Sequence, residues 1–295
     1  MTYKSFFLTT ALFLSLPQMA TAHGDAHQNG NHKESETQAG QARYLANSAV
    51  LVTEGETKIL FDPLFHNNFG QYQLVPDDVR AAIFASSGPF AGVDAVFISH
   101  AHGDHFNAGD ANQYLSQNPT VRFVAPQQAI DSMKKQEDWN EAFTSSITAV
   151  NLEYGASPVT IQVGDITATA VRIPHAGWPD PRRVSVQNMV YRVSIDGGAT
   201  VMHMGDADPR EQHYTPFADH WQAKQTDTAF PPYWFFLSDG GTDILTQTLN
   251  VQDAVGVHVP IKVPQELQDS GAQYFSTLGE TRAISIAKDE MDLGQ

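Results

Sequence analysis

A short apolar segment, residues 94–98, runs directly into the sequence SHAHGDHF at residues 99–106. The pattern H-x-H-x-D-H in this string places four side chains that can bind a metal within six residues: His100, His102, Asp104 and His105. Chance produces such a match in only about one chain in a thousand. In extended backbone, His100 and His102 point to the same side and can share one cation. Asp104 and His105, just past Gly103, can turn toward a second cation. A position where a strand meets a loop also holds the ligands on a rigid edge.

The composition restricts the chemistry of any such site. None of the 295 residues is cysteine, which excludes disulfides, thiolate metal sites and a cysteine nucleophile. Any bound metal must therefore use histidine and carboxylate ligands. Asp and Glu outnumber Lys and Arg by 33 to 17, giving a formal net charge of −16. This excess of negative charge argues against binding to nucleic acid or to an anionic membrane surface.

The N-terminal segment has the pattern of a targeting sequence. Residues 1–22 contain an early cation, Lys4, then an apolar run, then the triplet Ala20-Thr21-Ala22. This order predicts a secretory signal peptide that is cleaved after Ala22. An uncleaved anchor is the alternative, but the apolar run of about a dozen residues is short for a membrane span. We therefore expect a soluble periplasmic or secreted protein without stable membrane insertion.

The next segment, residues 23–42, has no large apolar side chain to bury. We expect a disordered tail, because burial cannot offset the entropy lost on ordering. His23, His27 and His32 give this tail either a loose affinity for metals or no role beyond a solvated linker. Residues 43–295 are expected to form the folded domain.

From residue 43 onward, short apolar or β-branched runs alternate with stretches of helical character. Strands are expected at residues 48–53, 57–61, 94–98, 121–125, 147–151, 158–163, 166–173, 189–195, 199–204 and 254–259. Helices are expected at residues 77–86, 107–116, 127–135, 137–144, 208–214, 243–251 and 264–271. Turn residues join some strands as hairpins, whereas helices separate others. This order predicts an α/β domain with mixed sheets flanked by helices.

Three further candidate ligands lie at or near the ends of predicted strands. His175 comes after the run that Pro174 ends, Asp206 follows Gly205, and His258 lies within residues 254–259. Sites in layered α/β folds collect at strand ends. Each of the three, taken alone, is more often a turn or packing residue, so their candidacy depends on the upstream motif.

These residues resemble the metallo-β-lactamase superfamily of metal-dependent hydrolases. The resemblance rests on the string from His100 to His105, the three later candidates, and the segments 47–52 and 59–63, and it covers residues 43–262. It implies an α/β fold with four layers, an αββα sandwich of two mixed β-sheets flanked by helices. It also implies an enzyme that acts on a small-molecule substrate.

The resemblance assigns the ligands to two divalent metal ions. His100, His102 and His175 would bind one metal, Asp104, His105 and His258 the other, and Asp206 would bridge them. Two such ions lower the pKa of a shared water to about 7 and hold the resulting hydroxide for attack. Asp104 is also the candidate catalytic residue. Zinc is the default ion for a histidine-rich site, although manganese and iron also suit these ligands.

Departures from the family pattern narrow the expected substrate. The absence of cysteine disfavours the commonest zinc β-lactamase design. The sequence IPHAGWP around His175, with Arg182, Arg183 and Asn188 downstream, is more similar to the lactonase-like and phospholipid-phosphodiesterase-like branch. We expect hydrolysis of an ester, a lactone or a phosphodiester. The alternatives are an iron-dependent redox enzyme on the same fold and a non-catalytic periplasmic metal-binding protein.

Several aromatic and basic residues are candidates for substrate contact. Trp178, Tyr233 and Trp234 are assigned to an apolar substrate pocket, with core packing as the alternative. Residues 64–72 form either a lid or a plain connection. Arg182 and Arg183 either bind a substrate phosphate or carboxylate or lie on the surface.

The remaining polar candidates have structural alternatives. Asp62 either hydrogen-bonds a ligand histidine or is a turn residue before Pro63. His66 and His203 are expected to be packing or surface residues, and His213 and His220 to lie on a solvated face. The sequence leaves the oligomeric state open.

Overall fold

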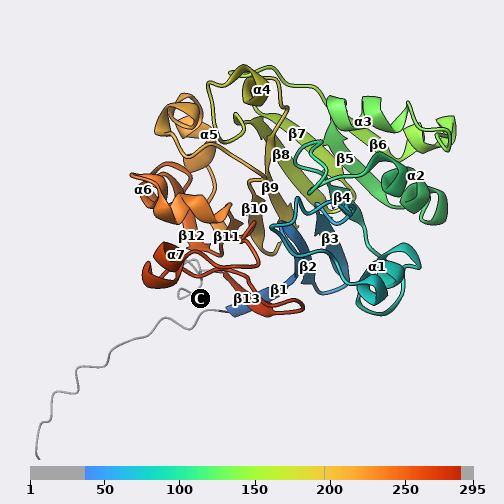
Figure 1. Ribbon diagram of the computed structural model, residues 1–295, viewed down its shortest axis with the longest axis horizontal. Coiled ribbons are helices and arrows are strands. Elements are labelled where there is room, and N and C mark those ends of the chain that lie inside the picture. The colour runs from blue at the N-terminus through green and yellow to red at the C-terminus, as the bar shows by residue number, and fades with distance from the viewer. Residues whose placement is uncertain (1–36, 196, 287–295) are drawn as a thin grey trace, which may run out of the picture. The chain divides into compact units, whose positions relative to one another are not determined.

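The computed structural model describes residues 37–195 and 197–286, which form two β-sheets with helices on their outer sides (Figure 1). In spatial order, the first sheet contains β13 (Thr281–Ile286), β1 (Thr37–Ala46), β2 (Ala49–Glu54), β3 (Thr57–Phe61), β4 (Ala95–Phe97), β5 (Arg122–Pro126) and β6 (Ile147–Val150). The second contains β12 (Val251–Ala254), β11 (Thr226–Phe230), β10 (Thr200–His203), β9 (Met189–Ile195), β8 (Ile166–Arg172) and β7 (Val159–Val163). The predicted signal peptide lies outside the described residues.

Helices cover the outer face of each sheet. The α-helices are α1 (Asp77–Phe84), α2 (Ala108–Gln117), α3 (Gln127–Met133), α4 (Pro181–Val184), α5 (Ala218–Gln222), α6 (Gly241–Asp243) and α7 (Gln265–Asp269). In Figure 1, α1, α2 and α3 lie on the side of the first sheet, whereas α5 and α6 lie on the side of the second. The predicted αββα sandwich with two mixed sheets is therefore confirmed.

The layers follow from the alternation of side chains along the strands. On β3, Ile59 and Phe61 point into the core between the two sheets, while Leu60 points toward α1–α3. Tyr191 on β9 packs from the second sheet into the same inner core, its ring centroid 5.3 Å from that of Phe97. The outer face of the second sheet packs against Trp221 of α5. Strands β4, β10 and β11 are thus buried along their whole length, whereas the edge strand β7 alternates buried and exposed residues.

The strand directions place the functional loops at one edge. Strands β3 to β6 are parallel to one another, so their carboxyl ends lie together. The motif at residues 99–106 follows β4 at this edge. In the second sheet, β10 runs antiparallel to β9, and the loop that carries Asp206 follows β10 directly.

Some expected elements need correction. Strand β1 begins at Thr37, so the boundary predicted at residue 42 was too late, and residues 37–42 are paired with β13 instead of disordered. The strand expected at 254–259 ends at Ala254 as β12, and isolated bridges follow it. The helices expected at 137–144 and 208–214 are shorter 3₁₀ turns, Glu141–Ser145 and Glu211–His213.

Within the described ranges, helices are all too short or too polar to cross a lipid bilayer.

Candidate metal centre

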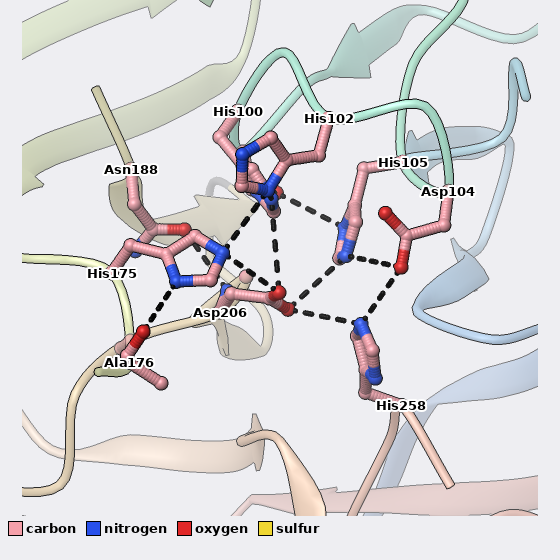
Figure 2. Close-up of polar contacts among 12 residues, drawn as sticks. His100, His102, Asp104, His105, His175, Ala176, Asn188, Asp206 and His258 are labelled. Atoms are coloured by element: carbon pink, nitrogen blue, oxygen red, sulfur yellow. Dashed lines mark hydrogen bonds and ion pairs between the residues drawn. The ribbon is translucent and has the colours of Figure 1, made fainter. Parts of the chain in front are cut away.

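Three histidines and one carboxylate converge in a first cluster (Figure 2). The Nδ1 atom of His102 lies 3.1 Å from Nε2 of His100 and 3.1 Å from Nε2 of His175. One oxygen of Asp206, Oδ2, lies 3.1 Å from His175 Nε2 and 3.8 Å from His100 Nε2. These atoms come from loops after β4, β8 and β10, so the two sheets both contribute to the cluster.

A second cluster lies beside the first and contains Asp104, His105 and His258. His258 Nε2 lies 3.2 Å from Asp104 Oδ2. The other oxygen of Asp206, Oδ1, lies 3.1 Å from His105 Nε2 and 3.2 Å from His258 Nε2. Asp206 therefore presents one oxygen to each cluster, which is the arrangement of a bridging carboxylate (Figure 2).

Unpaired buried polar atoms at the second cluster fit a cation. Asp206 Oδ1 and the Nε2 atoms of His105 and His258 are buried without an aligned hydrogen-bond partner in the described part of the chain. Unpaired buried polar atoms are costly, and a cation would satisfy all three together. The donor set of imidazole nitrogens and carboxylate oxygens suits zinc, manganese or iron. The sequence-predicted ligands are thus brought together, all seven of them.

The local electrostatics also favour metal binding. Burial lowers the pKa of His102 to about 4 and that of His100 well below its usual range, so both imidazoles are neutral at pH 7. Burial alone would raise the pKa of Asp206, but the imidazoles of His258 and His105 outweigh it and hold the carboxyl ionised. Burial alone would lower the pKa of His105, but the carboxylates of Asp206 and Asp62 outweigh it and raise that pKa, so this ring holds a proton that a bound metal would displace. The neutral rings of His100 and His102 beside the ionised Asp206 already have the protonation states that a metal requires.

Asp62 fixes the orientation of a ligand histidine. It stands at the end of β3 with φ 45° and is fully buried. Its Oδ2 lies 2.8 Å from His105 Nδ1, so the opposite nitrogen, Nε2, faces the second cluster. The backbone N–H of Ser99 donates to Asp62 Oδ1 at 2.6 Å, and the Ser99 hydroxyl donates to Oδ2 at 2.6 Å. Of the two roles expected for Asp62, the geometry matches the bond to a ligand.

Asp206 and His175 are fixed by their own backbone contacts. The Asp206 N–H donates to Asn188 Oδ1 at 2.9 Å. At the preceding Gly205, with φ 54°, a Cβ atom would collide with Asn188 and Ser99, so the close approach requires glycine. His175 Nδ1 lies 2.8 Å from the carbonyl oxygen of Ala176, which directs Nε2 into the first cluster.

His258 does not stand on a strand, contrary to expectation. Its φ of 60° is in the left-handed region, and its N–H donates to the carbonyl oxygen of Asn47 at 2.9 Å. The side-chain amide of Asn47 donates to the carbonyl oxygen of Asp104 at 2.9 Å. Asn47, in the turn between β1 and β2, thus connects two ligands of the second cluster. Asn47 adopts φ 47°, and the sequence signal for such a turn is an asparagine, a residue that tolerates positive φ, between two strands.

A cavity of about 490 Å³ opens onto both clusters. It is lined by Phe69, Gln71, Tyr72, His102, Asp104, His175, Ala176, Arg183, Asp206, Trp234 and His258. Of the predicted substrate residues, Trp234 lines the cavity, whereas Trp178 and Tyr233 are not among its lining residues. Trp178 instead packs on His213 and Arg210. Phe69, Gln71 and Tyr72, within the segment expected to be a lid or a plain connection, form part of the wall.

The other histidines in the described part of the chain, His66, His203, His213 and His220, lie outside the centre. His203 is buried, stacks on Phe61 at 4.9 Å and lies with Nε2 2.8 Å from the carbonyl oxygen of Ser48. His66 is exposed, as expected for a surface residue. His213, however, is fully buried with Nδ1 2.8 Å from the Tyr154 hydroxyl, so its predicted solvated position was wrong.

Comparison with known proteins identifies the family. Residues 41–220 match the model of the beta-lactamase superfamily domain, and the chain belongs to this superfamily. It is 38% identical over 66 residues to a UPF0173 metal-dependent hydrolase of Thermus thermophilus, covering 22% of this chain and 24% of that protein. A UPF0173 metal-dependent hydrolase of Thermococcus kodakarensis is 24% identical over 170 residues, covering 56% of this chain and 61% of that protein. The chain thus spans less than two thirds of the length of either relative.

A solved structure with the same fold is that of the metallo-beta-lactamase fold protein YhfI from Bacillus subtilis. It superposes with a TM-score of 0.53 at 15% sequence identity, covering 82% of this chain and 99% of that one. Similarity at this level concerns the fold alone.

Proposed function

We propose that this chain is a hydrolase that uses two divalent metal ions to cleave an ester, a lactone or a phosphodiester. The observation that carries the proposal is Asp206, whose two oxygens lie within 3.2 Å of imidazole nitrogens of the two separate clusters. The names of the two curated relatives and the membership of the superfamily support it. Zinc is the expected ion, with manganese and iron suited to the same ligands.

The chain's own residues would prepare such a reaction. Bound metal ions supply an activated water nucleophile and stabilise the negative charge that develops on the substrate. Asp206 fixes the spacing of the two clusters, and Asp62 holds the ring of His105 in one orientation. Asp104 and His102 border the cavity and lie where a substrate would approach.

The proposal predicts that His102→Ala or Asp104→Ala abolishes hydrolysis, because each removes a ligand atom at the cavity. The measurement is turnover of ester, lactone and phosphodiester substrates by protein of known metal content. His66→Ala is the matched control, since it removes an exposed histidine outside the centre. Unchanged turnover in either ligand variant would refute the proposed site.

Metal analysis of the purified protein, prepared without chelator or added metal, tests the count of ions. About two zinc or manganese ions per chain agree with the proposal. Predominant iron would favour the redox alternative, and a folded protein with little metal would contradict the ligand assignment.

We also propose that the protein is exported, with its leader cleaved after Ala22. The support is the order of cation, apolar run and A-x-A triplet in residues 1–22. N-terminal sequencing of protein from the periplasm or medium tests this, and a mature chain that begins at residue 1 would refute it.

A further inference from the structure

The wall of the cavity carries one permanent positive charge. Among the described residues that line it, Arg183 is the sole arginine, and no lysine accompanies it. The other ionisable residues of the wall are the histidines and aspartates of the two clusters and Tyr72. A substrate in this cavity therefore meets a single side-chain cation apart from any bound metal.

Two adjacent arginines of α4, Arg182 and Arg183, differ in whether the guanidinium group is already hydrogen-bonded. Arg182 is exposed and bound by Asp180, with Nη2 2.7 Å from Oδ2 and Nε 3.1 Å from Oδ1. The guanidinium of Arg183 has no hydrogen bond or ion pair of this kind with any residue in the described ranges. Its donors are thus available to a ligand, whereas those of Arg182 are already engaged.

The backbone beneath Arg183 is shaped to accept its side chain. At Gly177, where φ is 93°, a Cβ atom would lie 3.3 Å from Arg183 Cγ. The absence of a side chain there lets the stem of Arg183 lie against the loop that follows His175. The stem of Arg183 therefore packs against the loop that carries the candidate ligand His175.

The aromatic part of the wall lies beside the second cluster. Tyr72 and Trp234 both pack edge-on against His258, with ring centroids 4.2 and 5.3 Å away. Burial raises the pKa of Tyr72 above its usual range, Asp206 adds to this, and Arg183 acts in the opposite direction. Arg183 and Tyr72 line the same cavity.

We propose that Arg183 binds a carboxylate or phosphate group of the substrate that is separate from the bond being cleaved. This inference rests on the proposed hydrolase function and specifies its substrate as an anionic one. A guanidinium binds two-oxygen anions through two parallel hydrogen bonds, and the exposed Arg183 can offer both to a substrate in the cavity. The aromatic side chains of Tyr72 and Trp234 offer contact area for an apolar segment between the anionic group and the scissile bond.

The test uses Arg183→Gln, with Arg182→Gln as the matched control on the same helix. Three probes share one leaving group and chain length: 4-nitrophenyl hexanoate, 4-nitrophenyl hydrogen adipate and 4-nitrophenyl 5-phosphonopentanoate. For the metal-loaded wild-type protein, we expect kcat/KM to be higher for an anionic probe than for hexanoate. In Arg183→Gln, the ratio of anionic to neutral kcat/KM should fall at least about tenfold, chiefly through KM. The same ratio should be unchanged in Arg182→Gln.

The two anionic probes distinguish a carboxylate site from a phosphate site. An equal ratio in wild type and Arg183→Gln for both anionic probes would overturn the inference, while hydrolysis itself would still support the proposed function.

If the metal-loaded protein cleaves none of the probes, a binding measurement with amide analogues of the probes tests the anion site. The absence of cleavage would count against ester hydrolysis, and equilibrium dialysis of N-(4-nitrophenyl)adipamic acid and N-(4-nitrophenyl)hexanamide would then test Arg183 alone. The anion site is supported if Arg183→Gln raises the dissociation constant of the anionic amide at least about tenfold and leaves that of the neutral amide unchanged. Equal binding to both proteins would overturn it.

Discussion

At the scale of single residues, the centre depends on Asp62, a carboxylate that contacts a candidate ligand and not the candidate metal position itself. Asp62 accepts hydrogen bonds from Ser99 and lies 2.8 Å from His105 Nδ1, in a fully buried position. Asp62→Asn keeps the shape but removes the negative charge, and its amide cannot accept from both neighbours as the carboxylate does. We expect metal affinity at the second cluster to fall by about 10- to 100-fold, as is usual for such partners. Competition with a metal indicator measures it.

The control for this change is Asp110→Asn. Asp110 is also buried and bonded to a histidine, with Oδ2 3.2 Å from His66 Nδ1 and 2.8 Å from Arg80 Nη1, but it lies outside the centre. Metal affinity should be unchanged in this variant. If Asp62→Asn bound both ions as tightly as wild type, the orienting role of Asp62 would be wrong.

At the scale of elements, the loop after β8 is held by a residue of the loop after β10. Asp208 Oδ2 accepts from the Gly177 N–H at 3.2 Å and from Arg210 at 3.0 Å, while the Asp208 N–H donates to the Pro174 carbonyl oxygen at 2.8 Å. Asp208→Asn should weaken the charge-assisted contact with Arg210 and loosen the loop that carries His175. We expect a loss of about 1–3 kcal/mol of stability, seen as a melting temperature several degrees lower.

Glu153→Gln is the comparison for this element. Glu153 pairs with Arg172 at 3.3 Å but is 87% exposed, and exposed pairs contribute about 0–1 kcal/mol. Its melting temperature should stay within about 2 °C of wild type. Equal melting temperatures for Asp208→Asn and wild type would show that the loop does not depend on this contact.

The elements also show which parts of the molecule a sequence can predict. The strand before His100 and the ligands that follow it were predicted correctly, because the apolar run and the H-x-H-x-D-H pattern are adjacent in sequence. Strand β1 (Thr37–Ala46) was not among the predicted strands. Residues 37–42 are small or polar, and their order comes from pairing with β13 far along the chain. His258 was predicted as a ligand but misplaced on a strand, since its left-handed backbone depends on the distant Asn47. Which of Trp178 and Trp234 borders the cavity likewise depends on tertiary packing.

At the scale of the whole molecule, the centre joins the two sheets. His100, His102, Asp104 and His105 follow β4 of the first sheet, whereas His175 and Asp206 follow β8 and β10 of the second. Metal that binds all of them stabilises the folded chain relative to the unfolded one. Chelation should therefore lower the melting temperature, and returning zinc should restore it in proportion to the logarithm of its free concentration.

The size of this effect follows from linkage. Free zinc at 100 times its dissociation constant adds about 2.7 kcal/mol, which for a domain of this size raises the melting temperature by about 5–10 °C. His102→Ala should lose a large part of the increase because it removes a first-cluster ligand, whereas His66→Ala should retain it. Calorimetry of chelated and zinc-loaded protein measures the difference. If zinc left the melting temperature of the wild-type chain unchanged, the two sheets would not share a metal, and the clusters would be an ordinary buried polar network.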